Sequence, residues 1–221
     1  MTNSEIQEKI ATQKEITLRI LEYLNLLGID CCLAGGAIRN WYYGTPANDL
    51  DIYVSSYMSK SKLSDALGVG ASKIKEVGEC VFDPKKYPNS PVLDISEIVD
   101  YKYEGQTIQF IVCEPASKVT ATKLDTIKEL PPLPLPKSAV LGFKDAVRAH
   151  ICTGINKSLI GPDGTVEYCK ESLKDLEENT ITVYTEKMST HQHRLTLTNH
   201  LPKMIRYYPD HKVKIETGGP F

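Results

Sequence analysis

One stretch of the chain, from Leu33 to Val54, reads LAGGAIRNWYYGTPANDLDIYV. The short apolar run Ile29 to Ala34 precedes a pair of glycines and has the character of a buried strand. A short helix is expected from Ala37 to Tyr43, and strand character resumes from Asp49 to Val54 after a loop that contains proline. The stretch therefore predicts a strand, a Gly-Gly turn, a helix, a loop and a second strand.

Gly35 and Gly36 suit the binding of a triphosphate. Two glycines between a strand and a helix let backbone N–H groups approach phosphate closely, because no Cβ stands in the way. The N-terminus of the following helix adds a favourable dipole. Arg39 lies one turn into that helix, so its permanent positive charge is expected within reach of the same phosphates.

Asp49 and Asp51 suit the binding of a divalent metal ion. Residues i and i+2 of a strand share a face, so both carboxylates are expected on one face with Leu50 buried on the other. Two neighbouring carboxylates repel each other unless a cation lies between them. Ligands that are all oxygen favour Mg²⁺ or Mn²⁺, the ions that serve phosphoryl transfer.

The order of these residues, G-G-x-x-R-[D/N], a glycine, and then D-x-D followed by apolar residues, resembles the polymerase-beta-type nucleotidyltransferases. It is most similar to the head domains of tRNA CCA-adding enzymes and bacterial poly(A) polymerases. It is also similar to small nucleotidyltransferase-like proteins that phages often carry. The resemblance implies an α+β (mixed α/β) fold with a central mixed sheet flanked by helices.

The family's functional residues are carried over one position at a time. Gly35 and Gly36 match the turn that binds the nucleotide phosphates, and Arg39 matches the motif arginine. Asp49 and Asp51 match the metal-binding pair. The resemblance thus implies catalysis by Asp49 and Asp51 with Mg²⁺ (or Mn²⁺) as cofactor and an NTP, such as ATP, as substrate.

Two positions depart from the family pattern. Asn40 stands where the family commonly has Asp, so the hydrogen bonding at that position is altered. Gln109 lies on the central strand that is expected to carry a third carboxylate. The other candidates for this acid are Asp125, Asp145 and Glu114, and the sequence does not rank them.

Two functions follow from these residues. The first is an enzyme that transfers a nucleoside monophosphate from an NTP to a hydroxyl acceptor, which is an RNA 3′ end (including tRNA), a protein side chain or a small molecule. The chain shows no evident counterpart of the basic helices that hold tRNA in full-length CCA-adding enzymes, which disfavours general RNA polymerisation. The alternative is a catalytically inactive relative that binds a nucleotide or a protein partner, and Asn40 and Gln109 favour it.

Further helices and strands are predicted around this stretch from hydrophobic periodicity and from turn residues. Helices are expected at Asn3–Leu27, Lys60–Leu67, Ala116–Leu130, Lys170–Glu178 and His191–Tyr208, with Pro202 kinking the last or delaying its start. Strands are expected at Lys73–Phe82, Val140–Ile151 and Thr180–Tyr184, and a loop at Asp83–Pro91. Ile98–Tyr103 and Thr107–Cys113 are expected to form a hairpin across Glu104-Gly105.

A dense proline run separates the chain into two parts. Pro131, Pro132, Pro134 and Pro136 exclude regular helix and central strand, so the run is best interpreted as a stiff extended connector. We therefore predict a nucleotidyltransferase core with the GG and DxD motifs from residue 1 to 130. The C-terminal extension, residues 131–221, is expected to pack on this core as one compact unit.

The overall composition is that of an ordinary globular chain. Its 221 residues are 41% hydrophobic and 24% charged, with a net charge of −2, so it has no strong overall attraction to nucleic acid. None of the six cysteines forms a C-x-x-C pair, which disfavours a zinc ribbon and favours reduced thiols. No signal peptide and no membrane-spanning run are found, so no membrane partner is expected. The predicted location is cytoplasmic, in the host if the protein is phage-encoded, and the oligomeric state stays open.

Several smaller features are expected to be structural. Cys31 and Cys32 should point to opposite faces of a strand. Trp41 is expected in the core, and the spacing of His191 and His193 fits no common metal motif. The C-terminal basic residues are expected to solvate a helix face; they are Arg194, Lys203, Arg206, Lys212 and Lys214.

Overall fold

The computed structural model describes residues 1–77, 92–116, 141–185 and 195–216. The helices are α1 (Asn3–Leu26), α2 (Gly36–Tyr42), α3 (Lys60–Leu67), α4 (Phe143–His150), α5 (Lys170–Glu177) and α7 (Leu201–Tyr207). The strands are β1 (Cys31–Ala34), β2 (Asp49–Val54), β3 (Lys75–Glu76), β4 (Leu93–Tyr103), β5 (Gln106–Pro115), β6 (Leu159–Ile160), β7 (Val166–Glu167), β8 (Thr180–Tyr184) and β9 (Lys212–Glu216). The shorter helical turns are η1 (Ala71–Lys73), η3 (Gly154–Asn156) and the π-helical turn η4 (Thr196–His200).

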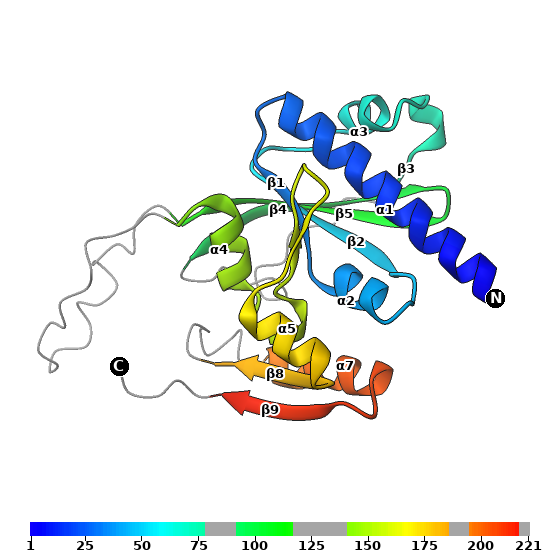
Figure 1. The fold of residues 1–221 in the computed structure, drawn as a ribbon. Helices are drawn as coiled ribbons and strands as arrows, with labels where there is room; N and C mark the ends of the chain where they lie inside the picture. The colour runs from blue at the N-terminus through cyan, green and yellow to red at the C-terminus, as the bar shows by residue number, and fades with distance from the viewer. Residues whose placement is uncertain (78–91, 117–140, 186–194, 217–221) are drawn as a thin grey trace, which may run out of the picture.

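A seven-stranded mixed sheet forms the centre of the molecule, in the order β3-β4-β5-β2-β1-β6-β7. Helices α1 and α3 lie on one side of this sheet, and α4 lies on the other (Figure 1). A second, parallel sheet of β8 and β9 lies next to α5 and α7. This is the mixed α/β architecture, with a central mixed sheet flanked by helices, that the sequence predicted.

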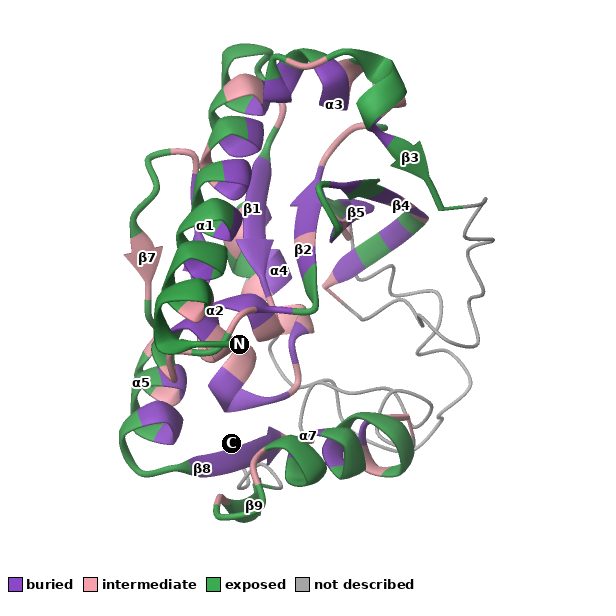
Figure 2. Cartoon of the chain, turned by 90° about the vertical axis from the view of Figure 1, so that its right-hand side faces the viewer, coloured by how far each residue is buried: buried purple, intermediate pink, exposed green. Residues whose placement is uncertain are grey.

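The two faces of the large sheet bury separate sets of apolar side chains. Cys31 and Leu50 belong to the core under α1 and α3, whereas Cys32 and Tyr53 belong to the core under α4. Figure 2 shows the buried strand β1 behind α1, whose exposed and buried residues alternate in stripes. The prediction that Cys31 and Cys32 point to opposite faces is confirmed, and so is the burial of Leu50.

Strand pairing places four residues in one row on the face that α4 partly covers. Asp51 on β2 lies beside Ala34 on β1 and beside Gln109 on β5. Gln109 in turn lies beside Asp100 on β4. Side chains at paired positions of neighbouring strands point to the same face, so Asp51, Gln109 and Asp100 share one side of the sheet.

The β4–β5 hairpin follows the prediction and extends it. Its turn is Glu104-Gly105, and both residues have positive φ, 49° and 77°. Two central residues with positive φ are typical of a type I′ turn, whose twist matches that of the flanking strands. This turn fixes the pairing of Tyr103 with Gln106, and the strands continue beyond the predicted ends to Leu93 and Pro115.

Trp41 lies in the core, as predicted, and is tied to α1. Its indole Nε1 donates to Gln13 Oε1 at 2.9 Å, and the same buried glutamine accepts from the backbone N–H of Ala47 at 2.9 Å. The Gln13 side chain also donates to the Ala47 carbonyl at 2.7 Å. Gln13 therefore anchors the loop that leads into β2, which holds Asp49 and Asp51.

The strand predicted at Val140–Ile151 is wrong, and the strand predicted at Lys73–Phe82 is confirmed in part, with residues 78–82 outside the described ranges. Val140–Ile151 contains helix α4, because Phe143, Ala146 and Val147 recur at helical spacing and are buried against the sheet. Of Lys73–Phe82, only Lys75–Glu76 is strand within the described residues, and the 3₁₀ turn η1 overlaps its start at Lys73.

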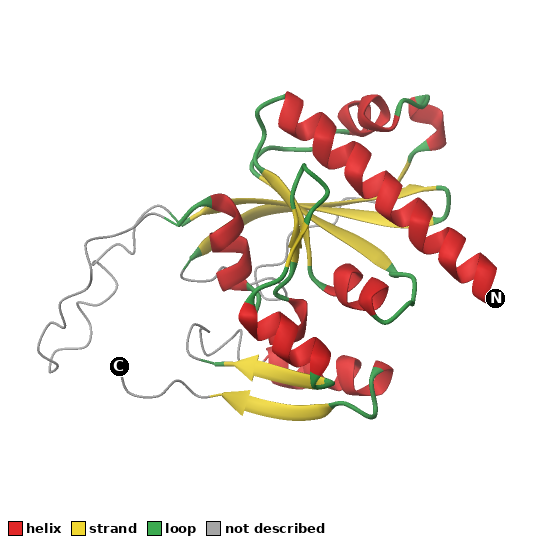
Figure 3. Ribbon diagram, viewed as in Figure 1, coloured by secondary structure: helices red, strands yellow, loops and turns green. Residues whose placement is uncertain are grey.

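The helix and strand predicted at Lys170–Glu178 and Thr180–Tyr184 are present, as Figure 3 shows. Pro202 lies in the first turn of α7, directly after the π-helical turn η4. The π-helical turn η4 runs directly into α7, so the described helix begins before Pro202, at Leu195. The predicted start at His191 lies outside the described residues, so a late start stays a prediction.

Several predictions lie outside the described residues. They are the helix at Ala116–Leu130 beyond its first residue, the loop Asp83–Pro91, the proline run, Cys80, Asp125, His191, His193 and Arg194. The division of the chain after residue 130 stays a prediction. The part beyond it that is described adds β6 to β1 of the large sheet. No helix in the described ranges is long and apolar enough to cross a membrane.

Candidate active site

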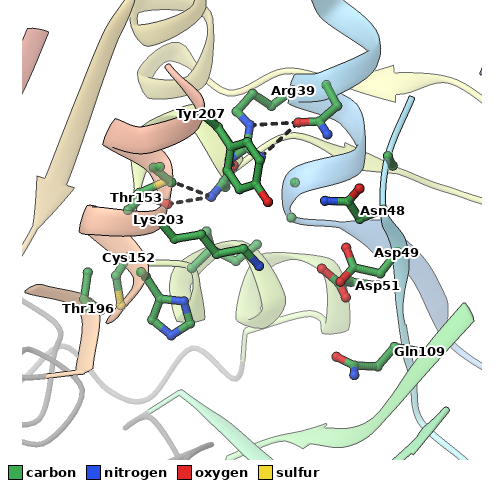
Figure 4. A pocket seen from close by; sticks show the side chains of 18 of the residues that line it. Arg39, Asn48, Asp49, Asp51, Gln109, Cys152, Thr153, Thr196, Lys203 and Tyr207 are labelled. Atoms are coloured by element: carbon green, nitrogen blue, oxygen red, sulfur yellow. Dashed lines mark hydrogen bonds between the residues drawn. The ribbon is translucent and has the colours of Figure 1, made fainter. Parts of the chain in front are cut away.

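A cavity of about 540 Å³ opens beside the row of residues on β2 and β5. Its lining includes Gly35, Gly36 and Arg39 from the Gly-Gly turn and α2, and Asp49 and Asp51 from β2. All five residues that the sequence singled out thus meet in one place. The opposite wall comes from η3, η4 and α7, far away in the sequence (Figure 4).

Gly35 brings the glycine turn into contact with the carboxylates. Its backbone has φ 81° and ψ −144°, a conformation that residues other than glycine rarely adopt. A Cβ added at Gly35 would lie 2.8 Å from Asp51 Oδ2. The absence of a side chain at this position therefore allows both the turn and the close approach of Asp51.

The two carboxylates lie on one face of β2, with Asp49 exposed and Asp51 half-buried. Burial, together with the negative charge of Asp49, raises the pKa of Asp51 to about 7, whereas Lys203 and Arg39 oppose the shift. Within the described ranges, no hydrogen bond to either carboxylate group is found. Their oxygens thus remain available to a ligand in the cavity, and a cation there would relieve their repulsion.

Arg39 is held by neutral groups. Its guanidinium donates to Asn40 Oδ1 at 2.9 Å, to Asn156 Oδ1 at 2.9 Å and to the Tyr208 hydroxyl at 3.1 Å. Its central carbon lies 4.8 Å from the centre of the Tyr208 ring. Among the described residues it has no carboxylate partner, so its positive charge is not neutralised and is available to an anionic ligand. Asn40, at the position where the resemblance led us to expect Asp, contributes to this by carrying no charge.

Lys203 is a cavity residue that the sequence analysis assigned to a solvated helix face. It lines the cavity from α7, and Figure 4 shows its side chain extending toward Asp49 and Asp51. Its positive charge lowers the pKa of Asp51, which places it within electrostatic range of that carboxylate. In the sequence, only the group of C-terminal basic residues pointed to a role for Lys203. That group does not separate Lys203 from Arg206, which lies on the same helix and does not line the cavity.

The third carboxylate is not found among the described candidates. Glu114 is exposed on β5, and Asp145 on α4 pairs with Arg148 at 3.2 Å; neither lines the cavity. Asp125 lies outside the described residues. No cluster of three or more His, Cys, Asp or Glu side chains that could hold a metal occurs in the part of the chain that is described. Gln109 occupies the position beside Asp51.

His150 lines the same cavity from the end of α4. Its Nδ1 is buried and has no hydrogen-bond partner among the described residues. Burial lowers the pKa of His150 to about 4, so its imidazole is neutral at pH 7. Because this ring is neutral, the positive charges near Asp49 and Asp51 come, among the described residues, from Arg39 and Lys203.

We expect His150 to make the protein less stable in mild acid. Its pKa is lowered from 6.5 to about 4 in the folded chain, so between these values only the unfolded chain binds the proton. The contribution of His150 to the free energy of unfolding is complete above pH 6.5 and is lost as the pH falls toward 4. Urea unfolding should show a loss of about 1 to 2 kcal/mol between pH 7 and pH 5 from this group. His150→Leu should flatten that part of the profile, and an unchanged slope in the variant would contradict the assignment.

Comparisons with known proteins identify the fold and leave the activity open. No protein-family model matches the chain, and no curated protein matches it in sequence. Among solved structures, a tRNA-processing enzyme in its apo form I matches with a TM-score of 0.50 and 14% identity, over 90% of this chain and 43% of that one. A CCA-adding enzyme from Bacillus stearothermophilus in complex with CTP matches with a TM-score of 0.50 and 13% identity, over 90% and 40%.

The chain spans less than half the length of these enzymes. At this level of identity the likeness shows the fold alone. It confirms the architecture that the residues from Leu33 to Val54 implied. The chain therefore has a mixed α/β fold similar to that of the tRNA-processing and CCA-adding enzymes.

Proposed function

We propose that the protein is a nucleotidyltransferase that moves a nucleoside monophosphate from an NTP to a hydroxyl acceptor, with Mg²⁺ or Mn²⁺ as cofactor. The observation that carries the proposal is the close approach of Asp51 to the Gly35 turn, where an added Cβ would lie 2.8 Å from Asp51 Oδ2. It brings a candidate phosphate-binding turn and a candidate metal-binding pair to one point of one cavity. Transfer from an NTP needs phosphate-binding groups and metal-binding carboxylates in one site.

The triphosphate would be bound by groups from both walls of the cavity. The backbone at Gly35 and Gly36 is open to close approach, and Gly36 begins α2, whose N-terminal dipole favours an anion. Arg39 and Lys203 add two positive charges that no described carboxylate pairs with. Since Lys203 belongs to the C-terminal part of the chain, binding of the triphosphate would connect that part to the Gly-Gly turn.

Asp49 and Asp51 fit a divalent cation. Both groups are hard oxygen donors on one face of a rigid central strand, and no hydrogen bond from a described residue occupies them. When bound there, such an ion would stabilise the negative charge that develops on the transferred phosphoryl group. The protein's own contribution is to hold the two carboxylates in place, with Leu50 and Ile52 buried on the opposite face.

The acceptor is a hydroxyl of an RNA 3′ end, a protein side chain or a small molecule. The similar fold of the tRNA-processing and CCA-adding enzymes supports an RNA acceptor, including tRNA. The described cysteines are free thiols, which supports a reducing, cytoplasmic site of action; they are Cys31, Cys32, Cys113, Cys152 and Cys169.

A second candidate is a catalytically inactive relative that binds a nucleotide or a protein partner, which Gln109 in place of a third carboxylate favours. A transfer assay separates the two. The purified protein is incubated with each labelled NTP, Mg²⁺ or Mn²⁺, and total RNA or lysate. Label on an acceptor supports the enzyme, whereas nucleotide binding without transfer supports the inactive relative. Absence of both contradicts the proposed use of the cavity.

We expect Lys203→Met to weaken the binding of a non-hydrolysable NTP about tenfold, because one of two charges facing the triphosphate is lost. The binding constant is measured by calorimetry in Mg²⁺. Arg206→Met is the matched control, since Arg206 lies on the same helix and does not line the cavity. Equal effects of the two substitutions would show that Lys203 acts only through the general positive charge of α7.

A further inference from the structure

Gln109 lies between two aspartates on neighbouring strands. It pairs with Asp51 on one side and with Asp100 on the other. Its Nε2 donates to Asp100 Oδ1 at 2.8 Å. Gln109 lines the cavity, whereas Asp100, one strand farther from β2, does not.

The hydrogen bond to Asp100 sets the orientation of the Gln109 amide. An ionised carboxylate only accepts hydrogen bonds, so the amide nitrogen must face Asp100. Since β4 and β2 flank β5 on opposite sides, the carbonyl oxygen Oε1 is then the polar atom left for the β2 side and the cavity. Figure 4 shows Gln109 on the same side of the cavity as Asp49 and Asp51.

We propose that Gln109 Oε1 is a third, uncharged oxygen ligand of the metal ion held by Asp49 and Asp51, and that Asp100 is the residue that positions it. This inference rests on the proposed function. It assigns a metal-binding role to residue 109, the position where a third carboxylate was expected. Adjacent strands lie about 4.8 Å apart, and glutamine is one methylene longer than aspartate, so its oxygen reaches farther toward the ion. Amide carbonyls are ordinary ligands of hard cations.

A neutral third ligand suits the charges already in the cavity. Asp49 and Asp51 already place two carboxylates at close range, and a third carboxylate at residue 109 would repel both Asp51 and Asp100 beside it. The amide adds a metal-binding oxygen without that repulsion. The expected consequence is a site that binds its cation more weakly than a three-carboxylate site, with Asp100 affecting affinity although it does not touch the ion.

The test is the binding of Mn²⁺ to the full chain, measured by electron paramagnetic resonance with and without a non-hydrolysable NTP. We expect Gln109→Leu to weaken Mn²⁺ binding about tenfold, and Asp100→Val to weaken it by a similar factor, as loss of an orienting partner commonly does. Asp100→Asn keeps an acceptor oxygen and should restore most of the affinity. Gln109→Glu adds a charged ligand and should tighten Mn²⁺ binding.

Asp94→Val is the matched control, because Asp94 is exposed on the same strand as Asp100 at its other end. Thermal unfolding of each variant shows whether it folds, and the Asn and Glu variants keep the test valid if a Leu or Val variant does not. Mn²⁺ binding that depends on Asp51 and is unchanged by Gln109→Leu would overturn this inference alone. Absence of Asp51-dependent Mn²⁺ binding would overturn the proposed metal site itself, and this inference with it.

Discussion

Asp51→Asn is expected to lower nucleotidyl transfer by about 10³-fold or more, since the substitution removes one of the two carboxylates that we propose as ligands of the metal ion. Asparagine has the shape of aspartate, so the backbone of β2 and the contact with Gly35 should be retained. The loss is therefore expected in turnover at saturating NTP. It is measured as label transfer per enzyme in Mg²⁺ and in Mn²⁺.

The stability of the same variant separates a damaged site from a damaged fold. Within the described residues Asp51 has no hydrogen bond to lose, and its charge lies beside that of Asp49. Replacing it with a neutral isostere removes repulsion, so thermal unfolding in EDTA should occur at the same temperature or higher. Asp65→Asn, at an exposed position on α3, is the control and should leave both transfer and stability unchanged. More than a tenth of the wild-type turnover in Asp51→Asn would exclude Asp51 as a metal ligand.

The site residues that the sequence predicted all lie close together in the chain. Gly35, Gly36 and Arg39 follow one another within a single turn, and Asp49 and Asp51 share a face because every strand alternates. These positions depend only on neighbouring residues, so the pattern of one short stretch predicted both their grouping and the fold.

The rest of the site comes from contacts across the whole chain. Asn156 and Tyr208, which hold Arg39, lie 117 and 169 residues away from it. Nothing in the residues around Asn156, Lys203 or Tyr208 distinguishes them from solvated positions. Their role depends on how the C-terminal part packs against α2, which a local pattern does not determine.

Asp100 is an intermediate case, because the register of the β4–β5 hairpin, which the sequence predicts, fixes its position. The Glu104-Gly105 turn was predicted, and a two-residue turn sets Tyr103 opposite Gln106. Counting back along both strands from that pair places Asp100 opposite Gln109. The hydrogen-bond partner of Gln109 was thus available from the sequence once the hairpin register was followed. Helix α4 was missed for a different reason. Apolar residues at Val140 and Ile151 flank it, and the whole apolar segment was therefore interpreted as a strand.

Gly35→Ala is expected to reduce both stability and transfer, through two separate effects. The positive φ of 81° would strain an alanine backbone by about 1 to 3 kcal/mol. In addition, the new Cβ would stand 2.8 Å from Asp51 Oδ2, closer than such atoms approach, so the carboxylate must move. A displacement of about 1 Å at a reacting centre costs about 10²-fold in rate, and we expect a loss of that size.

Gly44→Ala separates these two effects. Gly44 also has a positive φ, 68°, and it follows the other end of α2, but nothing lies within 4 Å of a Cβ built there. It should therefore lose about 1 kcal/mol of stability from backbone strain and keep its transfer activity. Urea unfolding measures the first quantity and label transfer the second. If Gly35→Ala loses no more activity than Gly44→Ala, the contact between the glycine turn and Asp51 does not position the carboxylate. If it loses activity far beyond its loss of stability, the glycine is required because it lets the Gly-Gly turn approach Asp51 on β2 closely.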